Sequence, residues 1–310
     1  MMIDKLIDAV LAMQNPSVLG LDTRIEYFPP GFSGAYDLGT LGGAAEAITD
    51  FNHILIDALC EIVPAVKVQA AYYEMYGVPG VTAFYDTMDY AKRKGMKVIA
   101  DAKRNDIGST ASAYSSAYLG RTPLSSGVKG RAFVADFLTV NPYLGEDGIL
   151  PFVEDCREYG KGKMPSSPKY GPSGGQLQNL DVGGAKLYER VGDYVCQWGR
   201  ELIGNHDYSS VGAVVGATYP LEGAELRKRL PSVFFLLPGY GAQGATAADL
   251  AGCFDERGLG AVVNASRSLQ CAWKYAPKED NFAKVIREAA LRMKKDICSA
   301  LDAAGKGVWK

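Results

Sequence analysis

Short apolar segments alternate with segments of helical periodicity along almost the whole chain, and this alternation is the strongest constraint on the fold. Segments that are apolar on both faces are typical of buried parallel strands covered by helices. We expect such strands at residues 17–22, 66–69, 98–100, 137–140, 211–215, 233–237 and 260–264. Seven clear strand–helix units and one doubtful unit fit a closed α/β barrel, the (β/α)8 or TIM barrel, better than an open sheet. At 310 residues the chain can form such a barrel as a single domain, residues 1–310.

The fifth of the eight strands is doubtful. It would have to lie between residues 160 and 175, where three prolines and five glycines occur within sixteen residues. Each proline removes a donor from the strand ladder, so this composition predicts no regular central strand. Either the sequence is locally corrupted, for example by compensating frameshifts, or the barrel is defective there, and the residues leave both readings open.

Composition and charge narrow the classes of partner. The net charge is −2 and no run rich in Lys or Arg occurs, which argues against nucleic acid or an anionic membrane as partner. No apolar run approaches the roughly 20 residues of a membrane span. The six cysteines are scattered singly, without Cys/His clustering, which predicts reduced thiols, a cytoplasmic location and no metal centre. A small molecule is therefore the expected partner.

Ionisable residues gather directly after the strand at 98–100. Asp101, Lys103, Arg104 and Asp106 follow within six positions. Strand alternation would place Asp101 and Lys103 on one face, at the strand end where barrels of this kind carry their chemistry. Alternatively, a helix begins here with Asp106 as its N-cap, and the two cations are merely solvated.

Two later loops have the composition of a phosphate site. Residues 238–244 contain glycines at alternate positions and Gln243, and residues 264–268 contain Arg267. Backbone N–H groups of such a loop bind anions, and Arg267 can grip two phosphate oxygens. They follow the last two strands, where barrels often hold phosphate. The alternative is that the glycines only allow tight turns and that Arg267 pairs on the surface.

The string Asp-x-Lys-x-x-Asp-Ile-Gly-x-Thr resembles the active-site signature of the orotidine 5′-phosphate decarboxylase family. It is matched here by Asp101, Lys103, Asp106, Ile107, Gly108 and Thr110. The loop Pro-Gly-x-Gly-Ala-Gln-Gly and the later arginine resemble the family's phosphate site, and residues 140–145, with Asn141, resemble its longer bacterial branch. Two residues at earlier strand ends also match, Asp22 and Lys67.

The resemblance implies decarboxylation of orotidine 5′-phosphate to uridine 5′-phosphate (UMP), the last step of de novo UMP synthesis, without a cofactor. Lys103 would be the proton donor and Asp101 would face the substrate carboxylate. The other implied roles are a second active-site lysine for Lys67, ribose binding for Asp22, phosphate binding for Gln243 and Arg267, and substrate binding for Asn141. In the family, the counterparts of Asp106, Ile107 and Thr110 reach into the neighbouring subunit's site, which implies a homodimer with shared active sites.

Two other functions remain open. A related magnesium-dependent sugar-phosphate decarboxylase or aldolase shares the barrel and the Asp-x-Lys-x-x-Asp strand end, although the Ile-Gly-x-Thr continuation favours the first reading. A catalytically impaired nucleotide-binding relative is suggested by residues 160–175, because the family's pyrimidine-contacting Ser has no evident counterpart there. Ser166, Ser167 and Ser173 are the only candidates.

Overall fold

Eight parallel strands close into a barrel in the order β1-β10-β9-β8-β7-β6-β3-β2, which confirms the predicted TIM barrel. The computed structural model describes residues 1–165, 175–241, 244–276 and 281–307. The barrel strands are β1 (Ser17–Leu21), β2 (Ala65–Gln69), β3 (Lys97–Arg104), β6 (Phe137–Val140), β7 (Gly162–Pro165), β8 (Ser209–Val214), β9 (Val233–Pro238) and β10 (Ala261–Ala265).

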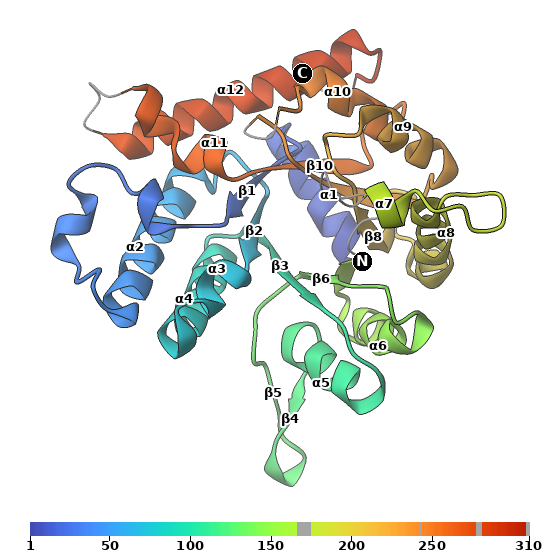
Figure 1. Cartoon of the computed structure of the whole chain (residues 1–310), viewed down its shortest axis with the longest axis horizontal. Helices are drawn as coiled ribbons and strands as arrows, with labels where there is room; N and C mark the ends of the chain where they lie inside the picture. Colours follow the sequence, from blue (N-terminus) through green and yellow to red (C-terminus); the bar gives the residue numbers. More distant parts are fainter. Residues whose placement is uncertain (166–174, 242–243, 277–280, 308–310) are drawn as a thin grey trace.

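Helices surround this barrel (Figure 1). They are α1 (Met2–Met13), α2 (Leu41–Leu59), α3 (Ala71–Glu74), α4 (Gly77–Arg93), α5 (Gly108–Tyr118), α6 (Leu150–Tyr159), α7 (Gly175–Gln178), α8 (Leu187–Gly199), α9 (Pro220–Arg229), α10 (Ala247–Leu250), α11 (Arg267–Gln270) and α12 (Phe282–Ala303). Residues 120–130 contain a short antiparallel pair, β4 (Thr122–Pro123) and β5 (Lys129–Gly130). This pair projects from the barrel beside α5.

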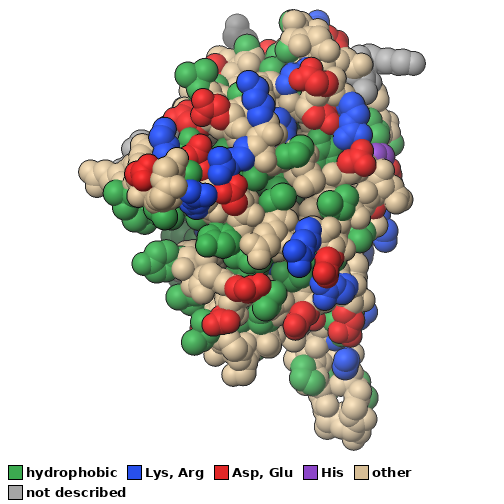
Figure 2. Space-filling model, turned by 90° about the vertical axis from the view of Figure 1, so that its right-hand side faces the viewer, with side chains coloured by type: hydrophobic (Ala, Val, Ile, Leu, Met, Phe, Trp, Pro, Cys, Tyr) green, Lys and Arg blue, Asp and Glu red, His purple; other side chains and the backbone are tan. Residues whose placement is uncertain are grey.

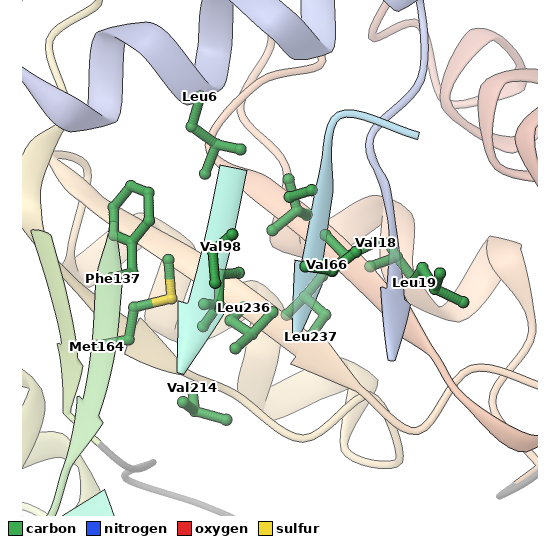
Figure 3. Packing of buried hydrophobic residues seen from close by; sticks show 14 of the residues in the cluster. Leu6, Val18, Leu19, Val66, Val98, Phe137, Met164, Val214, Leu236 and Leu237 are labelled. Carbon is green, nitrogen blue, oxygen red and sulfur yellow. The ribbon is translucent and has the colours of Figure 1, made fainter. Parts of the chain in front are cut away.

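The core is built from the apolar residues of the barrel strands and of the helices packed against them. All residues of β1 and β6 are buried, because a strand inside a ring of helices has no solvent-facing side. Figure 3 shows apolar side chains from several strands packed together, with Leu6 of α1 pointing toward the strands. Burial of this surface is the main force that holds the barrel closed.

The expectation that residues 160–175 provide no central strand is wrong for the first part of this segment. β7 pairs with β6 along its whole length, from Phe137↔Gly162 to Val140↔Pro165, but with β8 only at Lys163↔Val211. Pro165 ends the strand, and β8 pairs with β7 only at Lys163, so the missing N–H of Pro165 removes no donor from the pairing with β8. Gly162 is needed because a Cβ there would lie 2.3 Å from the Phe137 ring. Residues 166–174, and with them Ser166, Ser167 and Ser173, lie outside the described residues.

β7 also carries an unusual buried cation. Lys163 has no exposed surface, and its ammonium donates to the Ile149 carbonyl at 3.2 Å and lies 5.7 Å from the centre of the Trp198 ring. Burial lowers the pKa of Lys163 to about 7. Met164, by contrast, packs into the core beside Phe137 (Figure 3). The strand therefore forms, but with one side chain poorly suited to its site.

Among the described residues, no helix is long and apolar enough to cross a membrane. On the face drawn in Figure 2, basic and acidic side chains are interspersed, with hydrophobic side chains among them. That face presents no continuous surface of one charge, in keeping with the small net charge of −2.

Candidate active site

A cavity of about 290 Å³ lies at the carboxyl ends of the strands. Its walls come from β2, β3, β8, β9 and β10 and from residues that follow β1, β2, β9 and β10. Five side chains singled out in the sequence line it together: Asp22, Lys67, Asp101, Lys103 and Arg267. The barrel thus brings into one cavity groups that are far apart in the chain.

Four of these side chains form a row of alternating charge. The Lys67 ammonium lies 3.0 Å from Asp22 Oδ1 and 3.0 Å from Asp101 Oδ2, and the Lys103 ammonium lies 2.6 Å from Asp101 Oδ1. The inner pair is nearly sealed, with side-chain exposures of 4% for Lys67 and 8% for Asp101, whereas Asp22 and Lys103 are 27% and 37% exposed. Asp22 and Lys103, at the two ends of the row, are therefore accessible from the cavity, whereas Lys67 and Asp101 in the middle are buried.

Asp101 accepts hydrogen bonds from four side chains. Besides the two lysines, Gln69 donates to Oδ2 at 2.9 Å and Thr139 donates to Oδ1 at 2.8 Å. Burial alone would raise the pKa of Asp101, but Lys67 and Lys103 outweigh it and hold that pKa well below its usual range. Burial would likewise lower the pKa of Lys67, but Asp101 and Asp22 hold it above its usual range. Both inner groups are therefore charged at neutral pH.

Asp101 and Lys103 lie side by side as expected, but not through regular strand alternation. The register between β3 and β6 shifts here: Ala100 pairs with Leu138 and Arg104 with Val140, so four steps along β3 match two along β6. Within this bulge Lys103 has a φ of +48°, in the left-handed region that non-glycine residues rarely adopt. Such irregularities re-aim side chains, and this one turns the Lys103 ammonium onto Asp101.

The predicted phosphate region lies only partly within the described residues. Arg267, the first residue of α11, lines the cavity together with Gly239 and Tyr240 from the loop after β9. The Tyr240 hydroxyl donates to Asp296 of α12 at 2.6 Å, which ties this loop to the last helix. Gln243 lies outside the described residues.

Two glycine N–H groups of that loop are not open for an anion, contrary to expectation. Gly241 donates to the Ala245 carbonyl at 3.0 Å and Gly244 donates to the Gly241 carbonyl at 2.9 Å. Both glycines, like Gly239, have a positive φ, so their role is to let the loop turn tightly.

Four predicted residues do not line this cavity. Asp106, Ile107 and Thr110 lie in the turn after β3 and at the start of α5, where Asp106 accepts from the Ile107 N–H at 2.8 Å and Ile107 is 56% exposed. Asp106 is thus not the N-cap of α5, which is Ile107. Asn141 lines a neighbouring cavity of about 780 Å³, which also touches Lys103.

Three polar residues that hydrogen-bond to the carboxylates of the charged row were not predicted. Gln69 follows Lys67 by two positions in β2, so strand alternation was a signal for it. Thr139 is a single hydroxyl in an otherwise apolar strand, which is a weak signal. Ser266 donates to Asp22 Oδ2 at 3.0 Å. These two residues are 244 positions apart in the sequence, so no local pattern predicts this contact.

The model of the orotidine 5′-phosphate decarboxylase / HUMPS family matches residues 47–272 of this chain. The orotidine 5′-phosphate decarboxylase of Caldicellulosiruptor bescii is 39% identical, over 96% of this chain and 98% of its own. The chain belongs to the orotidine 5′-phosphate decarboxylase family. Its sequence is also 39% identical to the decarboxylase of Rhodopirellula baltica, over 93% of this chain and 96% of that one.

Solved structures of the decarboxylase family agree with this assignment. A putative orotidine 5′-phosphate decarboxylase from Streptomyces avermitilis superposes with a TM-score of 0.76 at 30% identity, covering 96% of this chain and 95% of that one. The orotidine 5′-phosphate decarboxylase of Leishmania donovani gives a TM-score of 0.72 at 28% identity, covering 97% and 99%. The prediction of a carboxy-lyase of pyrimidine biosynthesis is thereby confirmed.

Proposed function

We propose that this enzyme converts orotidine 5′-phosphate to UMP and carbon dioxide with Lys103 as the proton donor. The observation that carries the proposal is the charged row, with the Lys103 ammonium at its cavity end, 2.6 Å from the fixed carboxylate of Asp101. The family assignment supports the reaction, and the position of Lys103 supports its role.

The row suits a reaction in which negative charge moves from a carboxylate to a ring carbon. The substrate carboxylate would face Asp101, and this like-charge contact is relieved when carbon dioxide leaves. The carbon–carbon bond breaks and its electron pair stays on carbon six, beside the Lys103 ammonium, which stabilises it and then gives it a proton. Lys67 keeps Asp101 ionised throughout, and water reprotonates the Lys103 amine.

Binding energy for this step would come from the other end of the substrate. Arg267 and Asp22 both line the cavity. Arg267 would bind the phosphate, and Asp22 would accept a hydrogen bond from the ribose. Interactions with the non-reacting part of a substrate can offset the repulsion at the reacting carbon. By the family resemblance, Gln243 joins Arg267 at the phosphate, and Asn141 contacts the substrate from the adjoining cavity.

We also propose that the active form is a homodimer. Asp106, Ile107 and Thr110 do not line the cavity of their own chain, and Ile107 exposes more than half of an apolar side chain. A neighbouring subunit that received these residues would complete its site and cover Ile107 at the same time.

The remaining features of the proposal concern organisation and setting. The barrel, from β1 to β10, would be one domain of 310 residues. The enzyme would need no cofactor, because Lys67 and Lys103 supply the positive charge at the reacting centre. A cytoplasmic location is supported by the six cysteines, each in the described part of the chain and each a free thiol.

The direct test is an assay of the purified protein with orotidine 5′-phosphate. We expect loss of its absorbance, with one UMP and one carbon dioxide formed per substrate, both with and without a chelator. Loss of activity in the chelator would favour the magnesium-dependent sugar-phosphate enzymes. Tight UMP binding without turnover would favour a catalytically impaired relative.

Mixing two inactive variants tests the shared site. In a mixed dimer of Lys103→Ala and Asp106→Ala chains, one site would take Lys103 from one chain and Asp106 from the other, so activity should reappear. The control is each variant alone, at the same total concentration. If mixed dimers form, as checked by differently tagged chains, and remain inactive, Asp106 acts within its own chain.

A further inference from the structure

The bulge in β3 leaves a backbone donor that the strand ladder does not use. Between the pairs Ala100↔Leu138 and Arg104↔Val140 the ladder between β3 and β6 is interrupted. The N–H of Lys103 lies in this interval and donates to the side-chain oxygen of Thr139 at 3.0 Å. A side chain of β6 thus takes the place of the backbone acceptor that a regular ladder would supply.

The same hydroxyl also holds the carboxylate beside Lys103. Thr139 has no exposed surface, and its Oγ1 donates to Asp101 Oδ1 at 2.8 Å while it accepts from the Lys103 N–H. Asp101 Oδ1 is the oxygen that the Lys103 ammonium contacts at 2.6 Å. One buried hydroxyl therefore joins the backbone of Lys103 to the carboxylate that its own side chain meets.

We propose that Thr139 is a positioning residue of the decarboxylase, which fixes Lys103 and Asp101 relative to each other and thereby sets the rate of the chemical step. The inference rests on the proposed roles of these two residues. Thr139 does not line the cavity, so it acts only through them.

The contacts require a group that donates and accepts at once. A hydroxyl does both, whereas valine, of nearly the same shape, does neither. In a Thr139→Val variant the Lys103 N–H would lose its acceptor, and Asp101 Oδ1 would keep only the Lys103 ammonium. The left-handed backbone at Lys103 would then have lost a contact that favours it, and the ammonium would no longer be held at one place. Misplacement of a reacting group lowers the rate of chemistry more than it lowers ligand affinity.

The test compares Thr139→Val and Thr139→Ser with a matched control. Ser209 is also a buried hydroxyl beside a register shift of the barrel, and it accepts from the Val211 N–H at 3.0 Å and donates to the Gly199 carbonyl at 2.8 Å. It lies at the start of β8, the end of the barrel away from the cavity. Ser209→Ala therefore deletes the same kind of group without touching the site.

We expect the single-turnover rate and kcat of Thr139→Val to fall by about tenfold to a hundredfold, the effect of losing a hydrogen bond to a charged group. UMP affinity and KM should change less than threefold, and Thr139→Ser should restore most of the rate. Ser209→Ala should lower the melting temperature but leave kcat within about twofold of the wild-type value.

An unchanged kcat in Thr139→Val, or an equal fall in kcat for Ser209→Ala, would overturn the proposal. If Thr139→Val does not fold, Thr139→Cys replaces it, because Cys is close to Ser in size but is a weak donor. Equal kcat values for Thr139→Cys and Thr139→Ser would then overturn it. Failure of the underlying roles is recognised separately, since Lys103→Ala would in that case retain turnover.

Discussion

Removal of Lys67 should destabilise the folded protein at neutral pH. In Lys67→Met, Asp101 and Asp22 would each lose an ammonium at 3.0 Å while the side chain of Asp101 stays 92% buried, given its 8% exposure. Breaking a buried pair by removing one partner costs about 3–5 kcal/mol. Since Asp101 keeps Lys103 and Asp22 is partly exposed, we expect about 3 kcal/mol, or about 5 °C in melting temperature.

The pH dependence of that loss gives a second check. The wild-type Asp101 has a lowered pKa, so its ionised form stabilises the fold above the usual carboxyl pKa of 3.8, and this contribution is lost only as the pH falls through the lowered value. In the variant, the Asp101 carboxyl has lost the Lys67 ammonium that helps to lower its pKa, so it can take up a proton at higher pH. The difference in unfolding free energy between the two proteins should therefore shrink as the pH falls from 7 toward about 4.

Urea unfolding, followed by tryptophan fluorescence at several pH values, measures both effects. The matched control is Lys94→Met, because Lys94 contacts Asp57 at 2.6 Å but both side chains are well exposed, at 39% and 48%. Its loss of stability should be much smaller than that of Lys67→Met, because an ion pair in contact with solvent contributes little. A Lys67→Met protein that is as stable as the wild type at pH 7, or whose deficit does not change with pH, would refute this view of the row.

Three further substitutions have defined outcomes. In calorimetry, Arg267→Ala should weaken UMP binding by about 1.5–3 kcal/mol and leave uridine binding unchanged. An equal loss of affinity for uridine would contradict a phosphate role. Lys163→Met should stabilise the fold by a few kcal/mol up to about pH 7, because burial lowers the pKa of Lys163 to about 7. This gain should decline as the pH rises from 7 to 10.5, and a pH-independent gain in urea unfolding would argue against this cause. Gly162→Ala should lower the unfolding free energy by about 1–3 kcal/mol, because the alanine methyl group would meet the Phe137 ring. An unchanged melting temperature would show that the ring moves away at no cost.

The barrel and the Asp101–Lys103 pair could be predicted from the sequence because both leave local signals. Strands that are apolar on both faces recur along the chain, and Asp101 and Lys103 stand together where one of them ends. The contact between Lys67 and Asp22, in contrast, follows only from the pairing of β2 with β1, which sets the ends of the two strands side by side. The family resemblance named both residues as site residues but did not predict that they contact each other.

β7 could not be predicted because its stability comes from its neighbours. Gly162 and Pro165 are poor strand residues in isolation, but β6 offers a continuous ladder and the Phe137 ring fills the space above the glycine. Thr139 escaped notice for a related reason. The two contacts of Thr139 depend on the bulge in β3. No sequence periodicity predicts this bulge or the positive φ of Lys103.

The central claim is that Lys103 acts in the chemical step while the phosphate is held elsewhere. The most direct measurement is single-turnover decarboxylation by Lys103→Ala, with UMP affinity measured on the same preparation. We expect no detectable carbon dioxide above the uncatalysed rate, and a Kd for UMP within a few fold of the wild-type value. A rate within about tenfold of the wild type, or a loss of UMP binding that accounts for the whole defect, would contradict the claim.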